Sequence, residues 1–107
     1  MKSNLDNSKW VICPLHRPMA SIRLFCFPHA GGNAWAFRDW AARLPSHIEL
    51  RAIQYPGHGN RIQEEPLCDF DALFEAVAEN LSQIVDGRYM LLGHSLGAYL
   101  AFEFARH

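Results

Sequence analysis

The chain has 107 residues, of which 50% are hydrophobic and 20% are charged, and its formal net charge is -1. This length suits one domain, and the composition is that of a globular protein rather than a disordered one. Ten basic and eleven acidic residues without a run of either sign give no electrostatic reason to expect nucleic acid or a membrane as a partner.

The first nine residues, MKSNLDNSK, are polar and predict a disordered tail ahead of one domain over residues 10–107. Only a short apolar run follows, so we expect no signal peptide and no transmembrane segment, and a cytoplasmic protein. Cys13, Cys26 and Cys68 lie far apart and indicate free thiols. The histidines lack metal-ligand spacing, so no metal and no cofactor are expected.

The first part of the domain predicts two strands and a helix. Residues 10–13, WVIC, form a short apolar run that indicates an edge strand. Residues 21–27, SIRLFCF, are almost continuously apolar and predict a strand that is buried on both faces. Apolar residues at helical spacing then predict about three helical turns after the N-cap Asn33. These spaced residues are Phe37, Trp40, Ala41 and Leu44.

The second part continues the alternation of strands and helices. Residues 48–55 predict a strand, and a long apolar stripe predicts a helix that Asp69 caps and Gly87 ends at the C′ position. The stripe consists of Phe70, Leu73, Phe74, Val77, Leu81, Ile84 and Val85. Residues 88–94 predict a third buried strand, and residues 98–107 predict a helix against a sheet. This order implies an α/β fold, with a parallel sheet flanked by helices.

The clearest sign of chemistry is the sequence from Gly93 to Gly97. Gly93, His94, Ser95, Leu96 and Gly97 match the pattern G-x-S-x-G between a predicted strand and a predicted helix. Composition alone would produce the bare pattern in about 3% of such chains. A serine in this setting lies on a tight turn that holds its hydroxyl above the sheet. We therefore predict Ser95 as the catalytic nucleophile and Gly93 and Gly97 as the glycines that make room for the turn.

Two backbone amides are candidates for an oxyanion hole. Leu96 directly follows Ser95 at the entry to the predicted helix, whose first amides are unpaired and carry the positive end of the helix dipole. The loop PHAGG at 28–32 follows an earlier strand, so the amide of Ala30 is the second predicted donor. A plain strand-to-helix turn is the alternative for this loop. We expect His29 to shape the loop or line the pocket rather than act as a base.

Three blocks of sequence resemble the type II, or stand-alone, thioesterases that accompany nonribosomal peptide and polyketide synthases and belong to the α/β-hydrolase superfamily. The blocks are RLFCFPHAGGNAWAFRDWAARLP, AIQYPGHGNR and YMLLGHSLGAYLAFEFAR. The family's relatives include the thioesterase that releases medium-chain fatty acids from acyl carrier protein. An arginine usually follows the Pro-Gly pair in this family; here that residue is His58, although Arg61 is kept.

The resemblance implies a serine hydrolase that removes acyl groups from the phosphopantetheine arm of an acyl or peptidyl carrier protein, for proofreading or product release. It implies that Ser95 attacks the thioester while the amides of Ala30 and Leu96 stabilise the tetrahedral intermediate. Two other interpretations stay open at this point. One is an esterase or lipase with a small-molecule substrate, and the other is a truncated gene product without catalysis, inert or binding a partner through an exposed sheet edge.

The acid and the histidine of an α/β-hydrolase triad follow the serine in the chain. Only Glu103 and His107 are candidates after Ser95, and on a helix they lie about 12 and 18 Å along the axis, out of reach. The histidines that precede Ser95 have turn or packing explanations. We therefore assign no base and expect the N-terminal part of an α/β hydrolase, ending after the helix that follows the serine and inactive alone.

Overall fold

The structure is a computed structural model that describes residues 9–29, 31–67, 69–85 and 87–106. The predicted tail, except Lys9, lies outside these ranges, as do Ala30, Cys68 and His107. No helix in the described ranges is long and apolar enough to cross a membrane.

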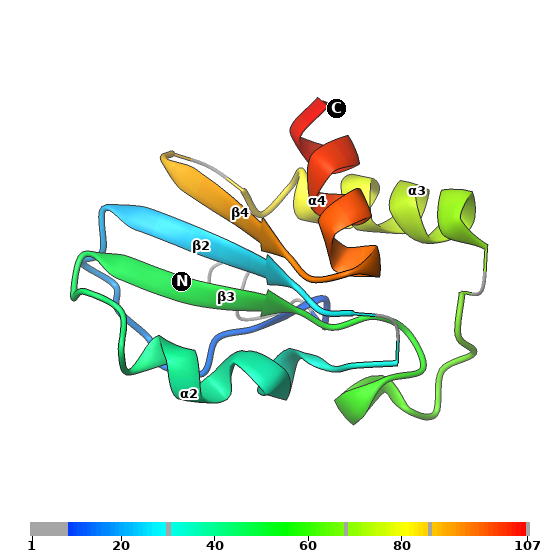
Figure 1. The fold of residues 1–107 in the computed structure, drawn as a ribbon, viewed down its shortest axis with the longest axis horizontal. Helices are drawn as coiled ribbons and strands as arrows, with labels where there is room; N and C mark the ends of the chain where they lie inside the picture. The colour runs from blue at the N-terminus through cyan, green and yellow to red at the C-terminus, as the bar shows by residue number, and fades with distance from the viewer. Residues whose placement is uncertain (1–8, 30, 68, 86, 107) are drawn as a thin grey trace.

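A four-stranded sheet forms the centre of the fold, in the order β1-β3-β2-β4 (Figure 1). The strands are β1 (Val11–Ile12), β2 (Ile22–Phe27), β3 (Ile48–Ile53) and β4 (Tyr89–Gly93). β2 pairs in parallel with both β3 and β4. The carboxyl ends of these three strands therefore meet at one edge of the sheet, where α/β proteins bind their ligands.

The sheet departs from the sequence prediction in two respects. β1 runs antiparallel to β3, so the sheet is mixed rather than wholly parallel. β4 was expected to be buried, yet Tyr89 is 43% exposed and Met90 is 51% exposed. The reason is that β4 pairs only with β2 among the described residues and forms an edge of the sheet. An apolar run predicts a strand but does not specify whether neighbours flank it on both sides.

Helical segments cover both faces of the sheet (Figure 1). A 3₁₀ turn η1 (Ala34–Phe37) and α2 (Arg38–Ala41) pack on one face, whereas α3 (Phe70–Leu81) and α4 (Leu96–Arg106) pack on the other. A second 3₁₀ turn, η2 (Gly59–Arg61), follows β3. The predicted α/β fold with helices flanking the sheet is thus confirmed.

Alternate residues of β2 explain the two layers, because successive side chains of a strand point to opposite faces. Phe25 and Phe27 pack with α3 and α4, and Leu24 and Cys26 pack with η1 and α2. All four side chains are at most 8% exposed. β2 was therefore predicted correctly as a strand buried on both faces.

Two predicted helices are shorter than expected. Asn33 caps its helix as predicted, with its side chain accepting a hydrogen bond from the amide of Trp35, but the helical residues end at Ala41. Asp69 likewise caps α3, which ends at Leu81 instead of near Val85. Gly87 has a positive φ of 64° but does not directly follow the helix. Apolar residues continue at helical spacing into the turns after each helix. Periodicity alone therefore does not distinguish these turns from further helical residues.

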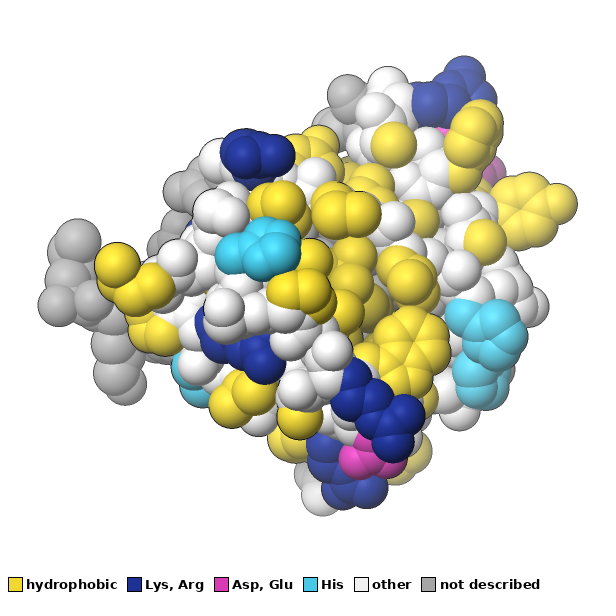
Figure 2. Space-filling model, turned by 60° about the vertical axis from the view of Figure 1, so that its left-hand side comes forward, with side chains coloured by type: hydrophobic (Ala, Val, Ile, Leu, Met, Phe, Trp, Pro, Cys, Tyr) yellow, Lys and Arg dark blue, Asp and Glu magenta, His cyan; other side chains and the backbone are white. Residues whose placement is uncertain are grey.

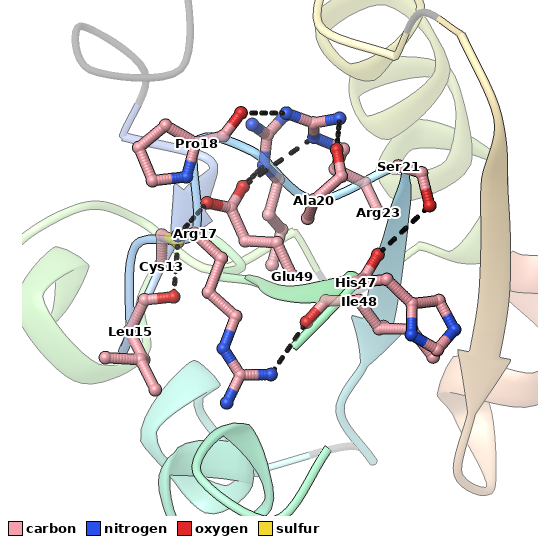
Figure 3. A network of polar contacts seen from close by, with 11 residues as sticks. Cys13, Leu15, Arg17, Pro18, Ala20, Ser21, Arg23, His47, Ile48 and Glu49 are labelled. Atoms are coloured by element: carbon pink, nitrogen blue, oxygen red, sulfur yellow. Dashed lines mark hydrogen bonds and ion pairs between the residues drawn. The ribbon is translucent and has the colours of Figure 1, made fainter. Parts of the chain in front are cut away.

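A buried carboxylate organises the opposite end of the sheet from the carboxyl edge (Figure 3). Glu49, near the start of β3, is 2% exposed. It accepts hydrogen bonds from the backbone amide of Arg17 at 2.6 Å and from Nε of Arg51 at 2.7 Å. Arg23 of β2 forms a longer ion pair with it at 3.8 Å. Burial of this charge is tolerated because arginines and an amide surround it.

Replacement of this carboxylate is expected to destabilise the protein. In Glu49→Gln the neutral amide removes the charge that Arg51 and Arg23 share, which should lower the free energy of unfolding by about 2 kcal/mol. Urea denaturation measures the loss as a lower midpoint at an unchanged slope. Glu65→Gln, at an exposed position, is the matched control, and an equal loss in both variants would contradict the role given to Glu49.

Candidate active site

The sharpest feature at the carboxyl edge is the corner between β4 and α4. β4 ends at Gly93 and α4 begins at Leu96, so only His94 and Ser95 separate strand from helix. Ser95 has a φ of 58° and is the only non-glycine residue among those described with a positive φ. L-residues are disfavoured in this backbone conformation. Backbone strain of this kind is typical of functional sites. Ser95 is also exposed, so the residue lies at the surface of the corner.

Two glycines allow strand and helix to meet this closely. A Cβ atom on Gly93 would lie 2.5 Å from Cα of Ala98, in the first turn of α4. A Cβ atom on Gly97 would lie 2.6 Å from the carbonyl carbon of Phe27 and from the carbonyl oxygen of Pro28. Real Cβ atoms essentially never come so close to other heavy atoms. Any larger residue at either position would push α4 away from the sheet.

The corner lies against the loop that follows β2. The amide of His94 donates to the carbonyl of Phe27 at 3.2 Å, and the rings of His29 and His94 meet edge to face with their centroids 5.3 Å apart. In this loop Gly31 has a φ of 80°, and the His29 ring occupies the space that a side chain on Gly32 would need. The predicted loop and the predicted nucleophile are therefore neighbours.

Of the two predicted oxyanion donors, the structure describes Leu96 and not Ala30. Leu96 is the first residue of α4, where helix geometry leaves amides without an intrahelical partner, and it directly follows Ser95. Ala30 lies outside the described residues, so its amide stays a prediction. Glu103, one of the two residues after Ser95 that were considered for the triad, forms an ion pair with Arg106 at 3.3 Å.

Two cavities flank the corner. The larger, of about 490 Å³, is lined by Pro28, His29, Ala36, Phe37, Trp40, Leu92, Gly93 and His94. The smaller, of about 290 Å³, is lined by Gly31, Tyr55, Pro56, His58, Pro66, Leu67, Leu73 and Leu96. His29 thus lines a pocket, as expected from the sequence. Figure 2 shows hydrophobic side chains running across the middle of one face toward histidine side chains.

The turn that carries His58 is fixed from beneath by buried polar side chains. Gln54 is fully buried; its Oε1 accepts from the amide of Ala34 at 2.9 Å, and its Nε2 donates to Oδ1 of Asn60 at 3.2 Å. The guanidinium of Arg61 donates to the carbonyl of Gln54 at 2.9 Å and lies 4.3 Å from the centre of the Trp10 ring. Sequence reasoning did not predict the role of Gln54, because a lone glutamine at a strand end carries no signal.

Arg61 also holds Glu64 by two hydrogen bonds, of 2.8 Å from Nε and 2.7 Å from Nη2. These hydrogen bonds lower the pKa of Glu64 to about 2, and an ion pair with Lys9 adds to the effect. Glu64 therefore stays ionised at any pH near neutral and fixes the guanidinium of Arg61.

One group of side chains has the composition of a metal site. Among the described residues, the candidate ligand atoms of Cys13, His16 and Glu49 all lie within 4.8 Å of one another. Burial raises the pKa of Cys13 to about 11, so it is a thiol rather than a thiolate at neutral pH. Glu49 already accepts hydrogen bonds from Arg17 and Arg51. Cys13 and Glu49 belong to the polar network of Figure 3, and we do not assign the group to a metal.

The sequence model of the thioesterase domain family matches residues 22–107. The chain belongs to this family. Its relatives include the gramicidin S biosynthesis protein GrsT of Aneurinibacillus migulanus, which is 41% identical over 99 residues, 92% of this chain and 39% of that protein. Thioesterase PikA5 of Streptomyces venezuelae is 38% identical over 104 residues, 96% of this chain and 37% of that protein.

Solved thioesterase structures share the fold. The type II thioesterase BorB, from the borrelidin biosynthetic cluster, superposes with a TM-score of 0.84 at 38% identity, over 99% of this chain and 42% of that chain. The chain thus spans about two fifths of the length of these relatives. The resemblance seen in the three sequence blocks is confirmed.

The close approach of α4 to β2 yields a first prediction for the site. Gly97→Ala places a methyl group against the backbone of Phe27 and Pro28, and the forced shift should lower the free energy of unfolding by about 2 to 3 kcal/mol. Urea denaturation tests this, with Ala98→Ser as the control because Ala98 is exposed in the same turn. A Gly97→Ala variant as stable as the native protein would show that the helix start can move freely.

The Arg61–Glu64 pair gives a second prediction, on pH. Because folding lowers the pKa of Glu64 to about 2 from 4.5, the pair stabilises the fold above about pH 4.5, and this stabilisation fades as pH falls toward 2. The difference in urea midpoint between the native protein and Glu64→Gln should therefore be present at pH 6 and shrink progressively below 4.5. Glu79→Gln, on the exposed side of α3, should show no such trend. A pH-independent difference for Glu64→Gln would argue against the ion pair.

Proposed function

We propose that the protein is a serine thioesterase that hydrolyses acyl groups from the phosphopantetheine arm of an acyl or peptidyl carrier protein. One observation carries the proposal: Ser95 is exposed, in a strained conformation, directly before the first turn of α4 in a chain of the thioesterase domain family. A turn chosen only for flexibility would place glycine, not serine, at a positive φ.

The chemistry follows from this placement. Oγ of Ser95 forms a bond to the thioester carbonyl carbon while its proton passes to a base. The carbonyl oxygen gains negative charge, which the amide of Leu96 receives at the positive end of the helix dipole, with the amide of Ala30 as the second donor. Collapse of the intermediate breaks the carbon–sulfur bond, and the sulfur leaves with the proton from the base. Water then hydrolyses the acyl-serine to a carboxylic acid and restores Ser95.

The base and its acid partner are not assigned to residues of this chain. In α/β hydrolases the acid and the histidine follow the serine in the sequence. The relatives extend well beyond the segment that this chain matches, and we infer that the family carries both residues in that further segment. Ser95 and the oxyanion donors are then the part of the machinery that these 107 residues supply.

The biosynthetic setting of the relatives supports a carrier-protein substrate. GrsT is named for the biosynthesis of gramicidin S, and BorB is described as a type II thioesterase of the borrelidin cluster. A thioesterase in such a setting would clear or release acyl groups that are bound to carrier proteins. The nucleophile alone does not distinguish this substrate from a small ester, so the substrate must be tested directly.

The test compares turnover of an acylated carrier protein by the complete protein encoded with this sequence and by its Ser95→Ala variant. Loss of the nucleophile should reduce turnover by about a thousandfold or more, since nucleophile and base act as a unit. Alanine preserves the corner, because it tolerates the left-handed conformation no worse than serine does. Ser46→Ala, at an exposed site in the loop before β3, should leave turnover unchanged. Near-native turnover by Ser95→Ala, or hydrolysis of a plain p-nitrophenyl ester but not of the acylated carrier protein, would refute the proposal.

A further inference from the structure

The smaller cavity beside the corner has a polar group that the mechanism does not use. Its lining residues are glycine, prolines, leucines, Tyr55 and His58. We propose, building on the thioesterase function above, that this cavity receives the acyl group and that His58 makes it select acyl groups with a hydroxyl, oxo or amino substituent near the carbonyl over plain alkyl groups.

The position of Leu96 links the cavity to the reacting carbonyl. Its backbone amide follows Ser95 at the start of α4, and the residue also lines the cavity. On the other side Gly31, which directly follows the predicted donor Ala30, lines the same cavity. A carbonyl that accepts a hydrogen bond from the Leu96 amide therefore has its neighbouring carbon atoms within reach of this space. The larger cavity is lined instead by His29 and His94, the residues that precede Ala30 and Ser95.

The size of the cavity limits what it can hold. At about 290 Å³ it lies at the lower end of the range for ligand sites, which is roughly 300 to 1,000 Å³. A space of this size suits a short acyl group. Its apolar walls, Leu67, Leu73 and Leu96 among them, suit the carbon chain of such a group.

His58 is the side chain that adds selectivity. The hydroxyl of Tyr55 donates to the carbonyl of Pro28 at 2.9 Å and is therefore engaged. Within the described ranges, the His58 ring meets Tyr55 edge to face, with ring centroids 6.2 Å apart, and its nitrogens make no hydrogen bond. A neutral imidazole offers one N–H donor and one acceptor. It can thus bind a hydroxyl, an oxo or an amino group on the acyl chain.

The turn holds His58 in place before any substrate arrives. Its amide donates to the carbonyl of Tyr55 at 3.2 Å, and its carbonyl accepts from the amide of Arg61 at 2.9 Å. Gly57 and Gly59 on either side have φ values of 84° and 53°, and a Cβ on Gly57 would meet the Pro66 ring at 2.9 Å. A side chain that projects from an already fixed backbone loses less freedom on binding, which favours selectivity.

The experiment measures kcat/KM of the complete protein on one carrier protein loaded with 3-hydroxybutyryl or with butyryl groups. The native protein should prefer the hydroxylated group by about threefold to tenfold, the contribution of one neutral hydrogen bond. His58→Phe should bring this ratio to about one and retain turnover of butyryl. His58→Asn, which keeps a donor and an acceptor, should retain part of the preference and covers the case in which the phenylalanine variant does not fold.

Two control variants make the result specific. His47→Phe changes an exposed histidine just before β3, at the opposite end of the sheet, and should leave the ratio as in the native protein. Trp40→Ala opens the larger cavity and should likewise leave it unchanged. A native ratio of one or less, an unchanged ratio in His58→Phe, or a shift in Trp40→Ala overturns the inference. Failure of the thioesterase proposal is distinct, since the native protein would then hydrolyse neither loaded carrier protein, or Ser95→Ala would hydrolyse both as the native protein does.

Discussion

The approach of α4 to the end of β2 is the contact on which the candidate site depends. Gly97 lies against the backbone of Phe27 and Pro28 with no room for a side chain. This contact fixes the helix start directly beside the loop that leaves β2, so Ser95, the amide of Leu96 and the loop residues His29 and Gly31 share one small region. The strain at Ser95 is sustained because the strand, the helix and the loop are each held by the others.

Much of this arrangement could be predicted from the sequence, because the signals are local. Continuous apolar runs predicted β2 and β4, Asn33 and Asp69 were recognised as caps, and the spacing of Gly93, Ser95 and Gly97 predicted the corner. The exposure of β4, the direction of β1 and the early ends of α2 and α3 were not predicted. These features depend on which segments become neighbours in space, and a run of apolar residues does not encode that.

The polar contacts that hold the sheet could not be predicted from the sequence either. Glu49 appears in the sequence as an ordinary strand residue, yet it is buried among Arg17, Arg23 and Arg51 at the end of the sheet away from Ser95. The contacts with Arg17 and Arg23 join residues far apart in the sequence and so leave no spacing pattern. The charged network thus lies at one end of the sheet and the strained turn at the other.

Gln54 connects two segments that lie apart in the sequence. Its buried amide bonds to Ala34 after the β2 loop and to Asn60 in the turn beside His58, and Gly59 lies too close to it for any side chain. Directed evolution of acyl preference would therefore do best to randomise His58 and Leu67 while keeping Gln54, Gly59 and Asn60 constant. Substitutions at those three positions would disturb the contacts that join the turn to the segment after the β2 loop.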